Sequence, residues 1–173
     1  MKFGDYIRKG FEVAQLKRDV VQLLAEDKEA FGPALAILAI GGVCAAIGAL
    51  SLRGIILMPI LRVVGFFIVI AIMHFVATSV MGGRAASVSS LFGPLGCASV
   101  ITWIGIIPVL GPVLAFLAGL WMLVIAVIVV EHAYQIDRTK AIIVVAVPVV
   151  LGLIIGLIMS LMVGLSAWAL LGR

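Results

Sequence analysis

GPALAILAIGGVCAAIGALSL, residues 32–52, contains no charged residue and decides which class of protein this chain belongs to. A helix rises about 1.5 Å per residue, so this run can cross a hydrocarbon core of about 30 Å. Pro33 suits the start of such a helix, because the N–H that proline lacks is not needed there. The whole chain agrees with this interpretation. Of its 173 residues 65% are hydrophobic and 12% are charged, whereas ordinary globular chains have about 45–50% and about 25%.

Four further apolar runs follow, at residues 59–81, 91–108, 113–132 and 140–171. Pro59 opens the first of these, and Arg62, one turn later, is expected to reach back to the lipid headgroups. The last run is longer than a bilayer core needs, and Pro148 predicts a kink or break in it. The sequence therefore predicts an all-α polytopic membrane protein with five transmembrane helices. It leaves no room for a large soluble catalytic domain.

An amphipathic segment precedes the first span. Within residues 3–30, apolar side chains recur at helical spacing on one face: Val13, Leu16, Val20, Leu23 and Leu24. This pattern predicts an amphipathic N-terminal helix. Such a helix can lie in the membrane interface, dock on a partner or pack on the mouth of its own bundle. The predicted domains are a cytosolic N-terminal helix at 1–31 and a five-span transmembrane domain at 32–173.

The distribution of basic residues predicts the orientation of the chain. With the N-terminus inside, the inner side would carry Lys2, Arg8, Lys9, Lys17, Arg18, Lys28, Arg84, Arg138 and Lys140. The outer side would then carry only Arg53, Arg62 and Arg173. Membrane proteins keep their Lys and Arg preferentially in cytoplasmic loops. We therefore predict a cytosolic N-terminus and an outside C-terminus, with the bias resting on the N-terminal segment.

The stretch EHAYQIDRTKA, residues 131–141, is predicted to be the inner turn between the fourth and fifth spans. Asp137 is well placed to cap the last helix. Glu131 and His132 are adjacent, so they point about 100° apart on a helix and do not form a ready-made dyad. Together with Asp137 and Arg138 they form either a solvated helix end or a surface that binds a partner.

The fifth span contains a row of small residues. Gly152, Gly156, Ser160 and Gly164 are spaced four apart, which predicts close helix packing. Their partner would be a small-residue step of the first span, such as Gly41 with Ala45 or Gly42 with Ala46, or a second copy of the chain.

His74 is an ionisable residue inside the second span, which makes it a candidate for a proton relay or a substrate contact. The alternative is a structural hydrogen bond, to a backbone carbonyl or to a serine such as Ser99. Trp121 lies in mid-span, so we expect it to pack inside the bundle, as core filler or over a cavity.

Signals for an enzyme are missing from the sequence. It contains no HExxH motif and only two histidines, so neither a metal nor a cofactor is predicted. It has no glycine-rich phosphate loop in a strand–helix context and no nucleophile elbow. No basic stripe interleaved with aromatic residues predicts nucleic-acid binding. The chain is therefore interpreted as a non-enzymatic protein.

Two stretches resemble the Yip domain family, the Ypt- and Rab-interacting integral membrane proteins. They are SLFGPLGCASVITWIGIIPVLGP at residues 90–112, with its proline-bounded turn, and EHAYQIDRTKAIIVVAVP at residues 131–148. The resemblance covers roughly residues 30–170 and implies five spans with a cytosolic N-terminus. Eukaryotic members carry a longer polar N-terminal region, so the short chain is more similar to a prokaryotic member. This implies the cell (inner) membrane.

The leading functional hypothesis is a membrane-organising or partner-binding adaptor, set in the lipid bilayer, that binds a cytosolic or membrane protein or a second copy of itself. Its cytosolic surface would comprise the N-terminal helix with Glu131, His132, Asp137 and Arg138. The alternative is a small channel or transporter whose path passes near His74 and Trp121.

Overall fold

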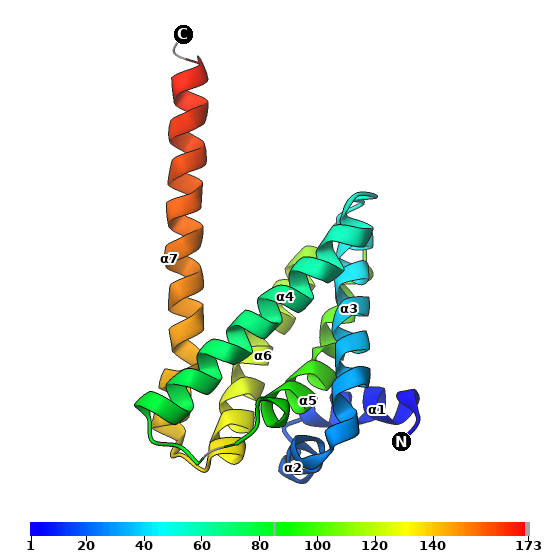
Figure 1. Cartoon of the computed structure of the whole chain (residues 1–173). Helices are drawn as coiled ribbons and strands as arrows, with labels where there is room; N and C mark the ends of the chain where they lie inside the picture. Colours follow the sequence, from blue (N-terminus) through cyan, green and yellow to red (C-terminus); the bar gives the residue numbers. More distant parts are fainter. Residues whose placement is uncertain (85, 172–173) are drawn as a thin grey trace.

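The computed structural model of the chain describes residues 1–84 and 86–171, and the surroundings of side chains as far as Met162. In these residues it contains helices and no strand (Figure 1). The α-helices are α1 (Phe3–Ala14), α2 (Arg18–Glu26), α3 (Phe31–Gly48), α4 (Gly54–Phe75), α5 (Val88–Ala98), α6 (Gly111–Tyr134) and α7 (Arg138–Leu171). Shorter segments are the 3₁₀-helices η1 (Lys28–Ala30) and η3 (Ser99–Ile106) and the π-helix η2 (Val76–Val80).

Five helical segments of the described chain are long and apolar enough to cross a membrane, which confirms the predicted all-α, five-span class. They are Lys28–Gly48, Gly54–Val80, Val88–Ile106, Gly111–Tyr134 and Arg138–Met162. Helices suit this role because each satisfies its own backbone hydrogen bonds in a medium without water. α1, α2, residues 81–84 and 86–87, and the α6–α7 connection lie at one end of the bundle, here called the N-terminal face (Figure 1). The turns at 49–53 and 107–110 lie at the opposite face.

The third span is the centre of the bundle. In its apolar 18-residue stretch, 67% of the residues are buried inside the protein, compared with 6% in the corresponding stretch of the second span. Glycines allow the close approach: a Cβ on Gly96 would lie 2.8 Å from Cβ of Ala34, and one on Gly93 would lie 2.7 Å from the carbonyl oxygen of Leu24. The eight residues of η3 also lengthen this short span. A 3₁₀-helix rises about 2.0 Å per residue, so α5 and η3 together reach about 32 Å.

Aromatic side chains join three spans around Phe92 of α5. Its ring centroid lies 4.5 Å from that of Phe31, 4.9 Å from that of Phe67 and 5.3 Å from that of Phe66. These rings belong to α3, α4 and α5, so the cluster fixes where the three helices meet. Aromatic pairs at such separations contribute about 0.5–1.5 kcal/mol beyond the area they bury.

The N-terminal segment forms two helices, so the prediction of a single helix over residues 3–30 is wrong at residues 15–17. Leu16 adopts a φ of 64°, a left-handed conformation that ends α1 and turns the chain. Both helices pack on the bundle and bury Tyr6, Val13, Val20, Val21 and Leu24. In the structure the segment therefore covers the mouth of its own bundle, which was one of the three alternatives that the sequence left open.

The second span starts earlier than predicted, because α4 begins at Gly54 and contains Pro59. A Cβ on Gly42 would lie only 2.5 Å from Cα of Pro59, so the first two spans meet backbone to backbone. The earlier start places Arg62 more than two turns inside the helix. There its guanidinium donates a hydrogen bond to the hydroxyl of Thr102. The expectation that Arg62 reaches back to the headgroups is therefore wrong.

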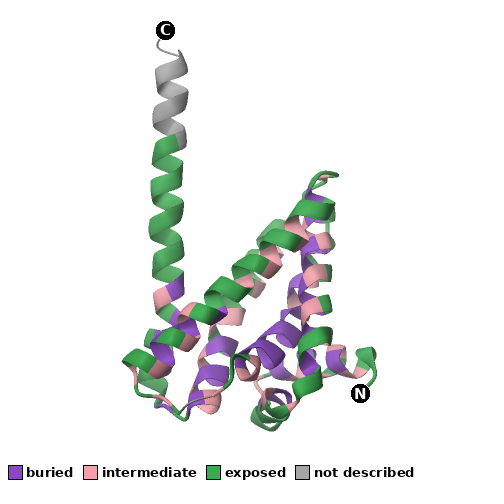
Figure 2. Ribbon diagram, viewed as in Figure 1, coloured by how far each residue is buried: buried purple, intermediate pink, exposed green. Residues whose placement is uncertain are grey.

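The fifth span packs on the other helices as far as Pro148 and leaves them beyond it. α7 continues through Pro148, so the expected break is absent. Every residue from Val149 to Met162 is exposed (Figure 2). Nothing in the described chain lies within 4 Å of a Cβ placed on Gly152 or Gly156, and the Ser160 hydroxyl donates to the carbonyl of Leu157.

The expected packing of this glycine ridge inside the bundle is therefore wrong at Gly152 and Gly156. Gly41 of the first span instead faces Arg62 and Thr102. Gly164 lies outside the residues whose side-chain surroundings are described. Packing of the ridge against a second copy stays a prediction.

Candidate functional site

A polar pocket opens at the N-terminal face between α2, the start of α5 and the end of α6. Its volume is about 470 Å³. Its wall is formed by Gln22, Ala25, Glu26, Arg84, Ser90, Glu131, His132, Ala133, Gln135 and Ile136. Although Glu131 and His132 project in different directions from the helix, both line this pocket. The structure therefore brings them together without making them a hydrogen-bonded dyad.

Glu131 and His132 each present a buried polar atom with no hydrogen-bond partner among the described residues. The atoms are Oε2 of Glu131 and Nδ1 of His132. The other carboxylate oxygen of Glu131 lies 3.9 Å from Nη2 of Arg18, which is an ion pair without a hydrogen bond. Leaving a buried polar group unpaired costs about 1–3 kcal/mol. Both side chains line the pocket, but these two atoms are closed to solvent, so each side chain has to turn before the atom can bond a molecule in the pocket.

The local backbone explains why the pocket has a defined shape. Gln135 ends α6 in a left-handed conformation with a φ of 52°. The N–H of Arg84 donates to the carbonyl of Tyr134 at 2.9 Å, which ties Arg84 to the end of α6. Gly83 is needed there, because a Cβ would lie 2.9 Å from the carbonyl oxygen of Ala77. Nothing in the sequence indicates that Arg84 and Glu131 line one pocket, because the two are far apart in the chain.

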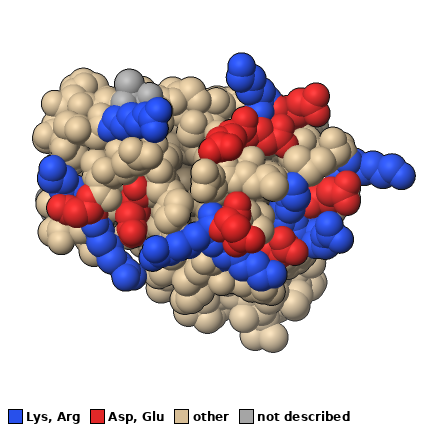
Figure 3. Space-filling model, turned by 90° about the horizontal axis from the view of Figure 1, so that it is seen from below, with Lys and Arg blue, Asp and Glu red and all other residues tan. Residues whose placement is uncertain are grey.

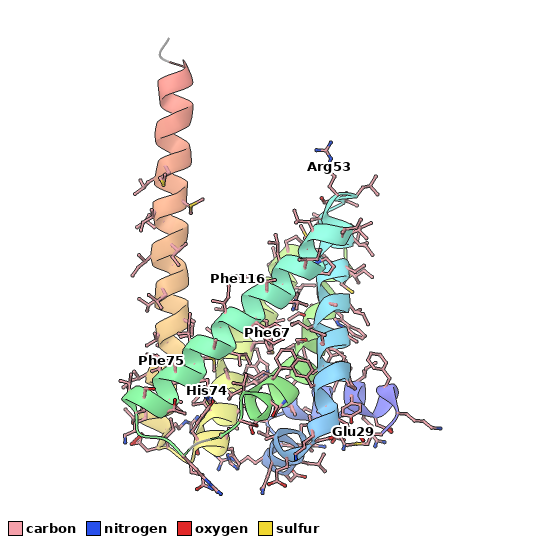
Figure 4. All side chains as sticks on the ribbon, in the orientation of Figure 1. Glu29, Arg53, Phe67, His74, Phe75 and Phe116 are labelled. Carbon is pink, nitrogen blue, oxygen red and sulfur yellow. The ribbon has the colours of Figure 1, made fainter. Side chains whose placement is uncertain are left out.

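Charged side chains of both signs gather on the N-terminal face, which Figure 3 shows from below. All acidic residues of the chain belong to the segments near this face: Asp5, Glu12, Asp19, Glu26, Asp27, Glu29, Glu131 and Asp137. Figure 4 places Glu29 at this end and Arg53 at the opposite tip. The bundle is therefore strongly polar at one end and weakly polar at the other.

Asp137 and Arg138 lie beside the pocket and do not line it. Oδ1 of Asp137 accepts a hydrogen bond from the N–H of Lys140 at 2.7 Å, which confirms that Asp137 caps the last helix. Arg138 is exposed. The predicted partner surface thus divides into two pocket residues, Glu131 and His132, and two residues at the start of α7.

Tyr6 links α1 to the segment after α2. Its hydroxyl donates to Oδ2 of Asp27 at 2.9 Å, and its side chain is 1% exposed. Burial, together with the hydrogen bond to Asp27, raises the pKa of Tyr6 to about 12. Because Asp27 precedes the first span, this contact holds the N-terminal helices against the membrane domain.

His74 lies near the N-terminal face and is hydrogen-bonded to another side chain (Figure 4). Its Nδ1 lies 2.7 Å from the hydroxyl of Tyr134, which is fully buried at the end of α6. The suggested partner Ser99 is wrong, because its hydroxyl donates to the carbonyl of Gly96. Sequence reasoning missed Tyr134 as the partner of His74, because the two residues are 60 positions apart in the chain.

Trp121 does not pack inside the bundle, so that expectation is wrong. Its side chain is 45% exposed, and its Nε1–H donates to the carbonyl of Ala14 at 2.9 Å. This hydrogen bond satisfies a free carbonyl at the end of α1. Trp121 lines an open hollow between α1 and α6, and neither Trp121 nor His74 lines the cavity of about 360 Å³ between the spans. The path expected for a channel is therefore not formed by these two residues.

A metal site is not formed by the part of the chain that the structure describes, where no three His, Cys, Asp or Glu side chains are suitably grouped. Cys44 and Cys97 are free and buried.

Comparison with known proteins gives one result. The family model of the Yip1 domain matches residues 16–170, which include α2 and all five spans. Neither a curated protein nor a solved structure matches the chain.

Proposed function

The chain belongs to the Yip1 domain family, and from this premise we propose that it is a non-enzymatic membrane adaptor that binds a protein at its N-terminal face. It is an integral membrane protein, set in a lipid bilayer by five apolar helices. The proposal adds an orientation, with residues 1–31 in the cytosol and residues 32–173 as the membrane domain with its C-terminus outside. It also assigns the protein to a prokaryotic cell membrane.

The observation that supports the adaptor role is that two residues lining the polar pocket, Glu131 and His132, each hold a buried polar atom, Oε2 and Nδ1, with no hydrogen-bond partner among the described residues. A carboxylate oxygen only accepts hydrogen bonds, and Nδ1 accepts or donates according to the tautomer. A Lys or Arg side chain of the partner would satisfy Glu131 and compete with the long contact to Arg18. The pocket volume of about 470 Å³ suits one such side chain with its neighbours.

The remaining polar residues of this face would widen the contact around the pocket. Asp137 and Arg138 lie at the start of α7, next to the pocket, and Arg138 is exposed. Rim charges of this kind mainly change the rate of association, whereas buried charges change the rate of dissociation. We therefore assign Glu131 and His132 the larger share of the binding energy.

Charge reversal at the pocket tests the proposal. The tagged full-length protein is crosslinked in its native membrane and extracted gently, and captured proteins are quantified by mass. Glu131→Lys should reduce capture of a stoichiometric partner at least tenfold, because a buried contact between charges is replaced by repulsion. Glu29→Lys is the matched control, since the side chain of Glu29 is 83% exposed on the same face. Equal capture by wild type, Glu131→Lys and Glu29→Lys would refute the assignment.

A further inference from the structure

A second cavity, of about 360 Å³, lies among the membrane-spanning helices. Apolar side chains such as Phe66, Met73 and Leu123 form most of its wall, and Arg62, Ser99 and Thr102 supply polar atoms. Val69 of α4 and Val149 of α7 line it as well and are exposed. The cavity therefore opens sideways, between α4 and α7, to the surface that faces lipid. Its volume lies within the range of ligand-binding sites.

Arg62 has no counter-ion in the described chain. None of the ion pairs that the described residues form includes it. All eight acidic residues of the sequence lie between residues 5 and 29 or at 131 and 137, in the segments of the N-terminal face. Arg62 follows the start of α4 at the opposite face by eight residues, or about 12 Å of helix. A cation at such a depth is normally paired or lines a pathway.

The guanidinium of Arg62 is held in place by its contacts in the bundle and has further N–H donors for a ligand. It lies against Gly41, where a Cβ would be 3.1 Å from Cζ of Arg62. It donates one hydrogen bond to Oγ1 of Thr102, which in turn donates to the carbonyl of Ser99 at 2.6 Å. A guanidinium carries five N–H donors in a rigid fork. An anion with two oxygens can therefore be bound without disturbing the contact to Thr102.

We propose that this cavity binds an anionic phospholipid from the bilayer, with its phosphate on Arg62 and one acyl chain in the apolar part. The sideways opening admits a molecule already dissolved in the membrane. The volume accommodates a single chain, so the second chain stays outside among the exposed residues of α4 and α7. The lipid phosphate supplies the negative charge that the protein lacks at this depth.

Lipid binding to the purified full-length protein tests the proposal. The delipidated protein in detergent is titrated with phosphatidylglycerol or with phosphatidylcholine of the same chains, and native mass spectrometry measures bound lipid. One phosphatidylglycerol per chain should bind more tightly than phosphatidylcholine. Arg62→Met should weaken phosphatidylglycerol binding roughly 10- to 100-fold, as expected for lost hydrogen bonds to a charged group. Arg53→Met, which changes an exposed cation near the opposite face, should leave it unchanged.

Filling the cavity gives an independent readout that does not depend on Arg62. Gly65 and Gly119 line the cavity, and nothing lies within 4 Å of a Cβ placed on either. Gly65→Leu and Gly119→Leu should therefore fold and weaken the binding of both lipids. Gly152→Leu has the same open surroundings outside the cavity and serves as control.

The outcomes decide between a lipid site and a structural arginine. Unchanged phosphatidylglycerol affinity in Arg62→Met, or equal affinity of the wild type for the two lipids, would overturn the proposal. If Arg62→Met does not fold, the Gly65→Leu and Gly119→Leu variants decide, and unchanged lipid binding in both would overturn it. Arg62→Lys should retain part of the preference, because it keeps the charge and loses the fork.

Discussion

Replacing Gly10 with alanine should release α1 from the bundle without unfolding the membrane domain. A Cβ at this position would lie 2.2 Å from the carbonyl oxygen of Cys97 and 3.2 Å from Cγ1 of Val100. The first neighbour is backbone of the central span and cannot turn away, so α1 must move by about 1 Å or detach. Overpacking of this kind costs about 1–3 kcal/mol. The opening equilibrium of α1 should therefore shift by about 5- to 150-fold.

Hydrogen exchange measured by mass spectrometry on the full-length protein in lipid nanodiscs is suited to detect this change. Amides of Phe3–Ala14 should exchange about 5- to 150-fold faster in Gly10→Ala, while the exchange rates of amides in the spans should not change. Alanine alone favours a helix over glycine by about 1 kcal/mol, so faster exchange must come from loss of docking. Gly4→Ala is the matched control, because it lies in the same helix with nothing within 4 Å of its Cβ position. Equal exchange in the two variants would refute the packing described for α1.

Three further predictions concern stability. Gly42→Ala should lower the thermal stability of the protein strongly, because the new Cβ would lie 2.5 Å from Cα of Pro59. Gly152→Ala should not lower it, because nothing lies within 4 Å of a Cβ at that position. Calorimetry of both variants in the same detergent checks this. The pKa of Tyr6 is raised to about 12, compared with about 10 in an unfolded chain, so the neutral phenol stabilises the folded state fully below pH 10 and less as the pH rises to about 12. Urea titrations at pH 8 to 12 should show that loss, and Tyr6→Phe should flatten it. Trp121→Phe should weaken the docking of α1 by about 0.5–1.5 kcal/mol, because the hydrogen bond to Ala14 is lost. Proteolysis within residues 15–17 should then become faster, and an unchanged rate would contradict this role of Trp121.

The spans could be predicted from the sequence because their signal is long and local. A run such as residues 32–52 has only one solvent in which it is stable, and the structure has a span at each predicted run. The ends were less certain: proline is tolerated inside membrane-spanning helices, so Pro59 lies inside α4 and does not open it. The cap formed by Asp137 was predictable, since capping depends on residues three apart.

Contacts between segments that are distant in the chain could not be predicted from the sequence. The bond between His74 and Tyr134 joins residues 60 apart, and nothing in either segment specifies the other. Trp121 was assigned to the interior because it lies in mid-span, yet α1 reaches it from the N-terminus and receives its hydrogen bond. The break at Leu16 also had no local signal, since leucine rarely adopts a positive φ.

The candidate site likewise has features that local sequence predicts and features that depend on how the helices pack. Glu131 and His132 were selected as the charged end of a span, which local sequence reveals. That both face one pocket, opposite α2 and Arg84, follows only from how the helices pack. In the same way, the depth of Arg62 and the absence of acidic residues around it became visible once α3, α4 and η3 were in place.

The most direct test of the adaptor proposal is a photo-crosslinking amino acid at Gln135, which is exposed on the rim of the polar pocket, compared with one at Arg53 on the opposite face. The full-length protein is irradiated in its native membrane, and crosslinked products are identified by mass. The account predicts one stoichiometric product from Gln135, absent from Arg53 and lost when Glu131→Lys is added. Products that are the same from both positions, or that persist with Glu131→Lys, would contradict it.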